Sequence, residues 1–375
     1  MKASILAVGT ELTTGQIINS NAQTLSQNLK ALGVVITSHL TVPDDKQIIL
    51  DSLNFLAGLS SGGGGEDDLI FVTGGLGPTS DDFTRDVLAE WSQIKMKFDE
   101  GTWTSIQERL TSRGYKVRDM QRQQCFFPEN AEILFNTQGT ANGFKFIAKN
   151  KTFYVLPGPP REIFAIWNDH IAAVLSEKTK NLDKLITKAW DTLGVGESEV
   201  AFSVEHVLKD RPPGLEIGYR VHLPYVEVKL SFLAAKTEQW APWIKKVDEV
   251  LETITVAKDF SDAVQLCSEK IKNVDFTFYD FVSDGYLHGR LSKQLNLLKN
   301  WSFKQSRNAP AVDMFEHEDD FLALFPYEDD KCILIHSLSG VRRLKTIEAP
   351  MKVPLMDERR RQYFAEMALV ELGRS

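Results

Sequence analysis

Strand-like and helix-like patterns of apolar residues alternate along the first half of the chain. Short apolar runs at Ser4–Val8, Val34–Ile36 and Leu69–Thr73 are typical of buried strands. Between the first two runs, apolar residues at helical spacing predict a helix that starts at Asn19–Asn21 and stops at Gly33. This alternation predicts a three-layer α/β domain, in which helices cover both faces of a mostly parallel sheet.

The same periodicities place further elements. Pro43–Asp45 opens a second helix, and the apolar residues that follow it at helical spacing are predicted to share one face: Ile48, Ile49, Leu53 and Leu56. The remaining predictions for this region are helices at Asp82–Trp91 and about Thr102–Arg113, a hairpin formed by Phe144–Ala148 and Thr152–Leu156, and a helix from about Pro160 to Leu175.

The pattern changes after about Glu177. An alternating strand at Val226–Phe232 belongs to a small α+β region, and a third α/β region closes with a helix at Asp357–Leu372. We therefore predict three domains, at residues 1–175, 176–255 and 256–375. Ser60–Gly65 lacks the Gly-Lys-Ser/Thr that completes a phosphate loop, and it precedes a strand, so we interpret it as a flexible linker.

Composition narrows the class of protein. The net charge of −8 argues against a nucleic-acid binder, which needs a basic face, although helix N-termini can still attract a small anion. No apolar run approaches the ~18 residues of a membrane span. Three scattered cysteines offer no zinc spacing and suit a reducing compartment. We expect a cytoplasmic protein with no nucleic-acid or membrane partner, which forms a homodimer.

The strongest chemical signal is the segment that follows the third predicted strand, Thr73-Gly74-Gly75-Leu76-Gly77. Glycines there let the backbone approach a ligand closely, and free amides near a helix N-terminus suit phosphate. Asp81 and Asp82 follow, and two carboxylates would repel a naked phosphate. A divalent cation resolves this conflict because it binds carboxylate and phosphate oxygens together. Alternatively, Asp81 caps the helix and Asp82 occupies its first turn.

Polar residues in two other turns bear on this choice. Thr10 and Glu11 leave the first strand, and Asp44 and Asp45 leave the second. Since ligands bind at the carboxyl ends of parallel strands, these turns should converge on one edge of the sheet. Taken singly, Asp44 is more typical of a helix cap, as are Asn19 and Asn21. Together with the glycine loop, the carboxylate-bearing turns favour a metal-assisted phosphoanhydride site.

Several ordered motifs resemble the CinA family, whose first domain is related to the molybdopterin-binding MogA/MoaB fold. The resemblance is strong over the first ~250 residues and weak beyond them. The matching segments are Val8–Leu12 with Gly15–Ile17, Asn19–Ala22, Val72–Asp82 with Thr84 and Arg85, Gly139–Ala141, Leu156–Glu162 and Gly194–Ser198.

This resemblance implies an ADP-ribose pyrophosphatase that needs a divalent metal such as Mg²⁺ together with K⁺, and that acts on ADP-ribose or a related small nucleotide. In the related molybdopterin enzymes the glycine loop holds a phosphate, and an aspartate matching Asp82 supports adenylyl transfer. The proposed roles follow. The amides of Gly74, Gly75 and Gly77 cradle phosphate after Thr73; Asp44, Asp81 and Asp82 bind metal and serve catalysis; Thr10, Glu11, Asn19 and Asn21 contact the ligand. The prolines of 157–160 are interpreted as a rigid turn.

The last third resembles the family's nicotinamide mononucleotide deamidase domain in degenerate form. Phe281 occupies the position of the serine nucleophile, and a phenyl ring cannot attack. We therefore predict a retained fold without deamidase activity; a replacement dyad of Ser283 with His288 is disfavoured because no third group orients it. Two rivals to the hydrolase stay open: molybdopterin binding or adenylylation, and a non-enzymatic nucleotide-binding scaffold.

Overall fold

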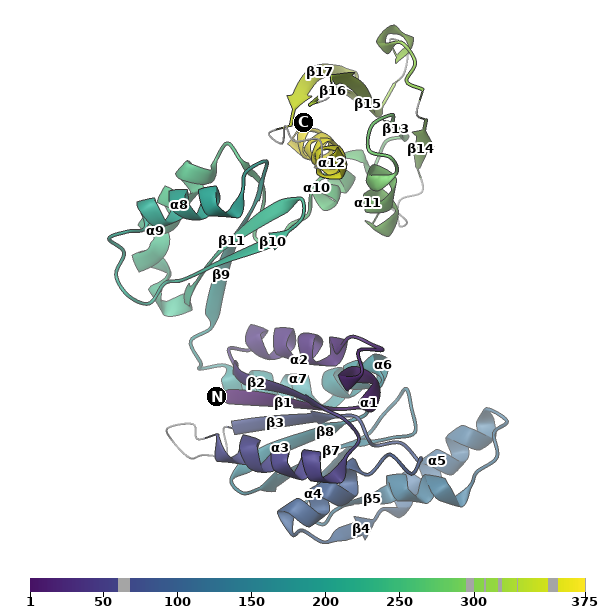
Figure 1. Cartoon of the computed structure of the whole chain (residues 1–375). Coiled ribbons are helices and arrows are strands. Elements are labelled where there is room, and N and C mark those ends of the chain that lie inside the picture. The colour runs from purple at the N-terminus through teal and green to yellow at the C-terminus, as the bar shows by residue number, and fades with distance from the viewer. Residues whose placement is uncertain are drawn as a thin grey trace. The chain divides into compact units, whose positions relative to one another are not determined.

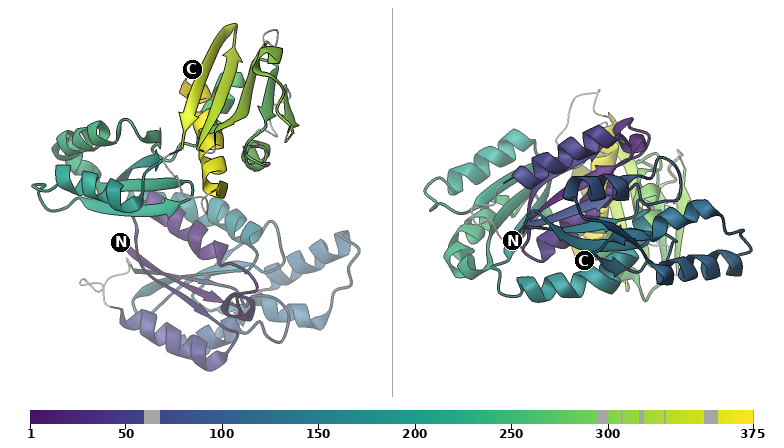
Figure 2. Two further views of the ribbon diagram at one scale, coloured as in Figure 1. Left: turned by 45° about the horizontal axis from the view of Figure 1, so that its top comes forward. Right: turned by 90° about the horizontal axis from the view of Figure 1, so that it is seen from below.

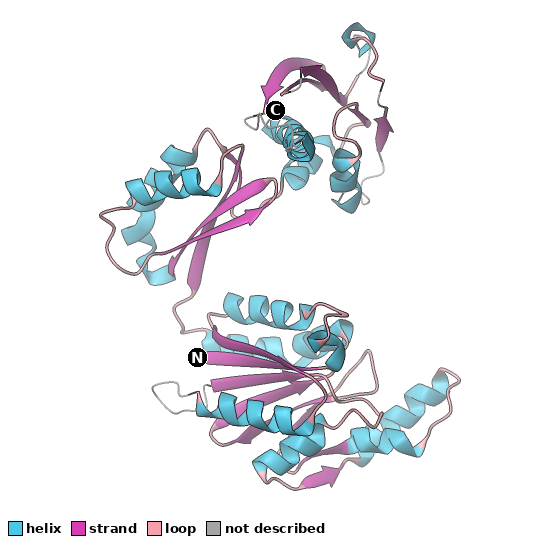
Figure 3. Cartoon of the chain, viewed as in Figure 1, coloured by secondary structure: helices cyan, strands magenta, loops and turns pink. Residues whose placement is uncertain are grey.

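The chain divides into two compact units, Met1–Leu185 and Ile186–Ser375. The computed structural model describes residues 1–59, 68–294, 300–306, 308–315, 319–328, 330–349 and 357–374, and the predicted linker at Ser60–Gly65 lies outside them. Figures 1 and 2 show the chain from three directions, and Figure 3 distinguishes its helices from its strands. The division into three domains stays a prediction.

A six-stranded sheet forms the centre of the first unit, in the order β2-β1-β3-β8-β7-β6. The first four of these strands are parallel, and β7 and β6 are added antiparallel at one edge. The bounds are β1 Lys2–Val8, β2 Val35–Val42, β3 Asp68–Thr73, β6 Glu132–Leu134, β7 Gly143–Ala148 and β8 Lys151–Leu156. The mostly parallel sheet predicted from the alternation is confirmed.

Helices cover both faces of this sheet because its central strands are apolar on both sides. Successive residues of a strand point to opposite faces. Phe71 of β3 accordingly packs with α2 (Ser20–Ala31) and α6 (Pro160–Ile166), and its neighbour Val72 packs with α3 (Lys46–Gly58) and α4 (Thr84–Ser92). Figure 1 shows these two helical layers above and below the sheet. The sequence therefore folds into the predicted three layers.

Smaller elements complete the first unit. A two-stranded sheet joins β4 and β5. A short helix leaves β1, and the helix after Pro159 runs through a π-helical segment before it ends. The bounds are α1 Thr10–Thr13, β4 Met96–Phe98, α5 Glu100–Ser112, a 3₁₀ segment Asp119–Cys125, β5 Phe126–Pro128, the π-helical segment Trp167–Ile171 and α7 Ala172–Thr179.

Two sheets occupy the second unit. The first has the order β10-β11-β9-β12, and its core includes residues of α8 and α9. The second has the order β14-β13-β15-β16-β17, with β13 parallel to both of its neighbours. The bounds are β9 Leu185–Leu193, α8 Glu197–Val207, β10 Glu216–His222, β11 Tyr225–Leu233, 3₁₀ Ala234–Lys236, α9 Thr237–Leu251, β12 Thr255–Lys258, α10 Ala263–Ile271, β13 Phe276–Asp280, α11 Tyr286–Gln294, β14 Trp301–Gln305, 3₁₀ Val312–Phe315, β15 Phe321–Glu328, β16 Lys331–Leu338, β17 Val341–Glu348 and α12 Asp357–Arg374.

A buried carboxylate ties the two sheets of the second unit together. Glu366 of α12 is fully buried and accepts hydrogen bonds from the hydroxyl of Tyr225 in β11, from the hydroxyl of Tyr286 in α11, and from Nε of Arg290. A buried charge is tolerated when hydrogen bonds and a counter-charge surround it. The second unit is therefore joined by polar as well as apolar contacts.

Most predicted elements of the first unit are confirmed, with corrections at their ends. α2 begins where Asn19 accepts a hydrogen bond from the amide of Ala22, and it stops before Gly33. Ile48 was wrongly placed on one face with Ile49, Leu53 and Leu56, because those three are buried whereas Ile48 is 42% exposed. The helix predicted from Asp82 begins only at Thr84. Among the described helices, none combines the length and apolar character needed to cross a membrane.

Candidate functional site

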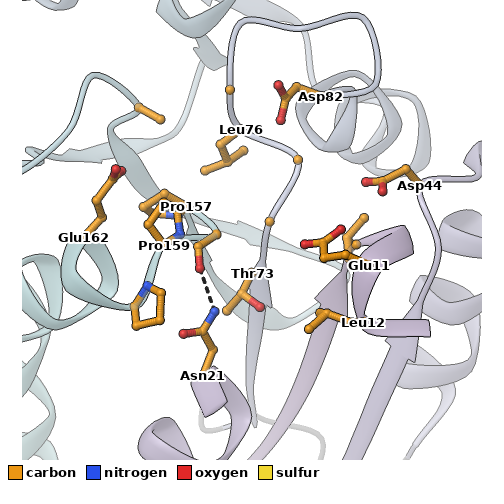
Figure 4. A pocket seen from close by; sticks show the side chains of 18 of the residues that line it. Glu11, Leu12, Asn21, Asp44, Thr73, Leu76, Asp82, Pro157, Pro159 and Glu162 are labelled. Atoms are coloured by element: carbon orange, nitrogen blue, oxygen red, sulfur yellow. Dashed lines mark hydrogen bonds between the residues drawn. The ribbon is translucent and has the colours of Figure 1, made fainter. Parts of the chain in front are cut away.

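A pocket of about 560 Å³ lies at the carboxyl ends of the parallel strands of the first unit. Figure 4 shows it from close by. Every residue predicted to bind a ligand or metal lines it except Thr10, which hydrogen-bonds to the lining residue Asp44. The lining residues are Val8, Gly9, Glu11, Leu12, Ile17–Asn21, Asp44, Thr73–Pro78, Asp81, Asp82, Gln124, Thr140, Ala141, Pro157–Pro160 and Glu162. The predicted convergence of three turns on one edge is confirmed.

The glycine loop has the conformation that only glycine adopts without strain. Gly74 and Gly75 have φ angles of 97° and 65°. A Cβ on Gly74 would collide with the carbonyl oxygen of Val8, and one on Gly75 would collide with the side chain of Thr84. One predicted role is corrected here: the amide of Gly74 donates to the carbonyl oxygen of Leu156 at 3.0 Å, so it is not a free phosphate donor.

The next three amides of the loop differ from that of Gly74 in their hydrogen bonding. Among the described residues, the N–H groups of Gly75, Leu76 and Gly77 have no hydrogen-bond partner. Two glutamines bind the carbonyl groups of the same loop. Nε2 of Gln123 donates to the oxygen of Gly77 at 3.0 Å, and Nε2 of Gln124 donates to the oxygen of Leu76 at 3.3 Å. The loop is thus fixed through its carbonyls while three donors stay available to a ligand.

Asp82 binds back to the turn that precedes it. Its Oδ2 accepts the amide of Thr79 at 2.9 Å and the Thr79 hydroxyl at 2.5 Å. Asp82 is therefore neither the cap nor a first-turn residue of α4, whose N-cap is Phe83. Asp81 is fully exposed, and hydrogen bonding to Thr79 lowers the pKa of its carboxyl. The lowered pKa keeps the carboxyl of Asp81 ionised at neutral pH, which suits a cation.

Asp44 closes the turn after β2 against the turn after β1. Its Oδ2 accepts the amide of Thr10 at 2.7 Å and the Thr10 hydroxyl at 2.9 Å. The neighbouring Asp45, not Asp44, caps α3 by accepting the amide of Ile48. The capping alternative considered for Asp44 is therefore wrong. In Figure 4, Glu11 and Asp44 project from neighbouring turns on the same side of the pocket as Asp82.

The two predicted asparagines have structural partners. Asn19 caps α2, and its Nδ2 donates to the hydroxyl of Thr41 at 3.2 Å. Nδ2 of Asn21 donates to the carbonyl oxygen of Gly158 at 2.7 Å, the dashed line in Figure 4. This bond anchors the proline-rich turn, residues 157–160, to the start of α2. Both side chains line the pocket, and their contact with a ligand stays a prediction.

Direct metal ligation was expected from Asp44, Asp81 and Asp82. Among the described residues, the group whose ligand atoms already lie within 4.8 Å of one another is Asp191, His222 and Glu227 in the second unit. Glu227 there is paired with Arg220 and Lys229. The pocket carboxylates are more dispersed. Mg²⁺ needs no such cluster, because it keeps several waters and takes one or two carboxylates together with phosphate oxygens.

Two buried groups beneath the loop were overlooked as site residues. Arg85 follows the loop, and burial lowers the pKa of its guanidinium to about 10 despite the nearby charge of Asp82. Among the described residues, its Nε and one terminal nitrogen have no hydrogen-bond partner. Oε1 of Gln124, in the pocket wall, is unpaired as well. Arg85 was noted only as part of a motif, and nothing in the pattern around Gln124 marks it.

Glu162 also lies in the pocket wall, opposite Asp44 and Asp82 (Figure 4). Its Oε2 accepts Nδ2 of Asn136 at 2.6 Å. Burial raises the pKa of its carboxyl, which outweighs the hydrogen bond from Asn136 and the nearby charges of Arg109 and Arg161. Glu162 was not predicted as a site residue, although it follows the proline-rich turn. A Pro-Pro-x-Glu segment at a helix start could have marked it.

The chain is similar to a known family of domains and to several named proteins. Residues 4–177 match the family model described as a probable molybdopterin binding domain. A "putative competence-damage inducible protein" of Desulforamulus reducens is 34% identical over 253 residues, covering 66% of this chain and 58% of that relative. A protein of the same name from Clostridium botulinum (strain Kyoto / Type A2) is 30% identical over 274 residues, covering 73% and 64%. The chain thus spans about three-fifths of these curated relatives' length.

Solved structures similar to part of this chain include two of related name. The CinA protein "with unknown function" from Thermoplasma acidophilum is 27% identical, with a TM-score of 0.40, over 45% of this chain and 95% of that one. The molybdopterin biosynthesis enzyme MoaB from Thermus thermophilus is 18% identical, with a TM-score of 0.31, over 48% and 97%.

The match over residues 4–177 supports a nucleotide- or pterin-related binding or enzymatic domain in the first half of the chain. The family model and the relatives together support a CinA family protein.

The expected enzyme class has to be corrected. The relatives are named competence-damage inducible proteins, and the family model describes molybdopterin binding; an ADP-ribose pyrophosphatase-type hydrolase has no support in either. The exclusion of a nicotinamide mononucleotide deamidase has no support in these names either. The resemblance carried the hydrolase assignment, because the residues of the pocket indicate phosphate and metal without naming a reaction.

Proposed function

We propose that the pocket of the first unit binds the phosphate end of a phosphorylated pterin or nucleotide, with a divalent cation between that phosphate and the pocket carboxylates. The observation that carries this proposal is a set of three amides without a partner among the described residues, those of Gly75, Leu76 and Gly77, in the lining of a cavity at the carboxyl edge of a parallel sheet. Unpaired donors of this kind cost free energy unless water or a ligand satisfies them, and oriented amides suit anions.

The carboxylates of Asp44 and Asp82 favour a cation beside the phosphate. Asp44 and Asp82 each use Oδ2 for a threonine, and Oδ1 of each has no partner among the described residues. These two free oxygens would hold Mg²⁺, which offsets the repulsion between carboxylate and phosphate. The cation supplies charge neutralisation, and the protein positions the phosphate. Potassium and a homodimer stay predictions of the sequence.

Calorimetric titration of the full chain tests the proposal. The probes are 6-hydroxymethylpterin phosphate and guanosine monophosphate, each with its phosphate-free counterpart, in Mg²⁺ and in EDTA. Loss of the phosphate should weaken binding roughly 10- to 100-fold, as expected for charge-assisted hydrogen bonds. Asp82→Asn should weaken it about tenfold in Mg²⁺ and little in EDTA.

Asp86→Asn is the matched control, because Asp86 is exposed, lies four residues away and is outside the pocket lining. It should bind like the unaltered chain. Equal affinity for phosphorylated and phosphate-free probes, or equal losses in both variants, would contradict the proposal.

A further inference from the structure

The wall of the pocket opposite the cation-binding carboxylates holds one more acid, Glu162. It is the third residue of α6, directly after the proline-rich turn. Figure 4 shows its carboxylate on the far side of the pocket from Asp44 and Asp82. A ligand whose phosphate lies on the glycine loop would therefore extend its other end toward Glu162. The cavity of about 560 Å³ falls in the range that holds ligands of drug size, such as a bicyclic ring with a phosphate.

A buried asparagine fixes the orientation of this carboxylate. Asn136 is 4% exposed, and its Nδ2 donates both to Oε2 of Glu162 at 2.6 Å and to the oxygen of Ala141 at 2.9 Å. Its Oδ1 accepts the amides of Gln138 and Gly139, and its own amide donates to Asn142. Every polar group on the side chain of Asn136 is thus engaged, which preorganises the acid it holds.

The backbone is also shaped around Glu162. A Cβ on Gly139 would overlap the carboxylate, so the absence of a side chain there makes room for it. Arg109 is close but donates to the carbonyl oxygen of Gly139, not to the acid. Among the described residues, Oε1 of Glu162 has no partner. The structure therefore keeps a half-buried carboxylate in the pocket lining with one oxygen unpaired, at a cost in desolvation.

We propose that Glu162 recognises the 2-amino-4-oxopyrimidine edge that pterins and guanine share, an inference that rests on the proposed function. This edge presents a ring N–H and an amino N–H side by side. Two parallel donors match two carboxylate oxygens. Oε1 accepts the amino group, and Oε2 accepts the ring N–H with a lone pair that Asn136 leaves free. Lumazine and xanthine present a carbonyl in place of the amino group, and adenine presents an acceptor in place of the ring N–H.

A change of one atom tests this pairing. In Glu162→Gln, the oxygen of the new amide stays on Asn136 and its NH₂ takes the place of Oε1, since Asn136 donates to the Oε2 position. The amide then matches a carbonyl at ring position 2. The full chain and this variant are titrated in Mg²⁺ with two pairs of probes: 6-hydroxymethylpterin phosphate against 6-hydroxymethyllumazine phosphate, and guanosine monophosphate against xanthosine monophosphate.

The unaltered chain should prefer the 2-amino member of at least one pair by roughly 10- to 100-fold, and Glu162→Gln should reverse that preference. The pair that shows the effect distinguishes a pterin from a guanine nucleotide. A gain of affinity for the 2-oxo probe cannot come from misfolding. Glu129→Gln, an exposed acid outside the pocket lining, is the control and should leave both preferences unchanged.

Different results overturn the two proposals. Phosphate-dependent binding with no 2-amino preference, or with a preference that Glu162→Gln leaves intact, would overturn the role of Glu162 alone. A reversal in Glu129→Gln would do the same. Binding that is indifferent to the phosphate would overturn the proposed function.

Discussion

Two turns of the chain connect a strand to a helix in the same way but differ in the hydrogen bonding of their backbone amides. The glycine loop leaves β3 and enters α4, and the turn at 281–285 leaves β13 and enters α11. Each follows a buried strand that lies between two parallel neighbours. In the second turn, Asp280 accepts the amides of Val282 and Ser283 at 3.0 and 2.7 Å together with the Ser283 hydroxyl.

The two turns differ in whether a carboxylate of the turn accepts the backbone amides that follow the strand. Ser283 also accepts the amide of Leu287 at the start of α11 at 2.9 Å, so Asp280 and Ser283 together bind several donors of the second turn and of the helix after it. Phe281 packs against Phe315 and Phe325. In the glycine loop, Asp82 instead binds Thr79 and leaves Gly75, Leu76 and Gly77 without acceptors. The strand–turn–helix arrangement alone therefore does not indicate a ligand; unpartnered donors in a pocket do.

The largest expected effect concerns the backbone of the two turns. Gly75→Ala should cost about 1–2 kcal/mol of stability for the left-handed conformation and about 1–3 kcal/mol more for the collision with Thr84. Gly285→Ala should cost only the first amount, because the nearest neighbour of its Cβ would lie at an ordinary 3.7 Å. Urea denaturation measures both. Equal losses would mean that the two loops are equally constrained.

The next effect concerns the carboxylates. Asp280 is 1% exposed, so Asp280→Ala leaves buried donors unsatisfied and should lower the free energy of unfolding by about 2–4 kcal/mol. Asp82→Ala should cost under about 1 kcal/mol, because water reaches the exposed Thr79. Only Asp82→Ala should reduce phosphate-dependent binding. The comparison fails if Asp280→Ala is the milder change in thermal and chemical denaturation.

The smallest effect is a pH-dependent gain of stability. Burial raises the pKa of Glu162 in the folded chain above its ordinary value of 4.5. The folded state thus holds the proton more tightly than the unfolded state, and the charged form is destabilising above the raised pKa. Glu162→Gln should melt at a higher temperature at pH 7, and the gain should vanish as the pH falls below about 4.5. A gain that is the same at pH 7 and pH 4 would show that the charge is not its cause.

The sequence predicted the architecture of the first unit because its periodicity is strong there. Apolar runs of five or six residues and capped helices such as that after Asn19 leave little choice of element. The convergence of Thr10 and Asp44 followed from the rule that parallel strands share a carboxyl edge. The short strands β4, β5 and β6 escaped prediction because three residues carry almost no periodicity.

Single atoms within the site could not be read from the sequence. Nothing in Thr73–Gly77 distinguishes the amide of Gly74, which pairs with Leu156, from those of Gly75 and Gly77. That difference depends on where β8 lies beside β3. Glu162 likewise depends on Asn136, 26 residues away along the chain, to face the pocket. Long-range packing decides both.

One NMR titration tests the central claim most directly. The full chain, labelled with ¹⁵N-glycine, is titrated with 6-hydroxymethylpterin phosphate and Mg²⁺, and amide resonances are assigned by single glycine substitutions. Gly75 and Gly77 should shift strongly downfield as their N–H groups donate to phosphate, while Gly74 and Gly285 change little. Saturable binding with no shift at Gly75 and Gly77, or with the largest shift at Gly285, would contradict the account.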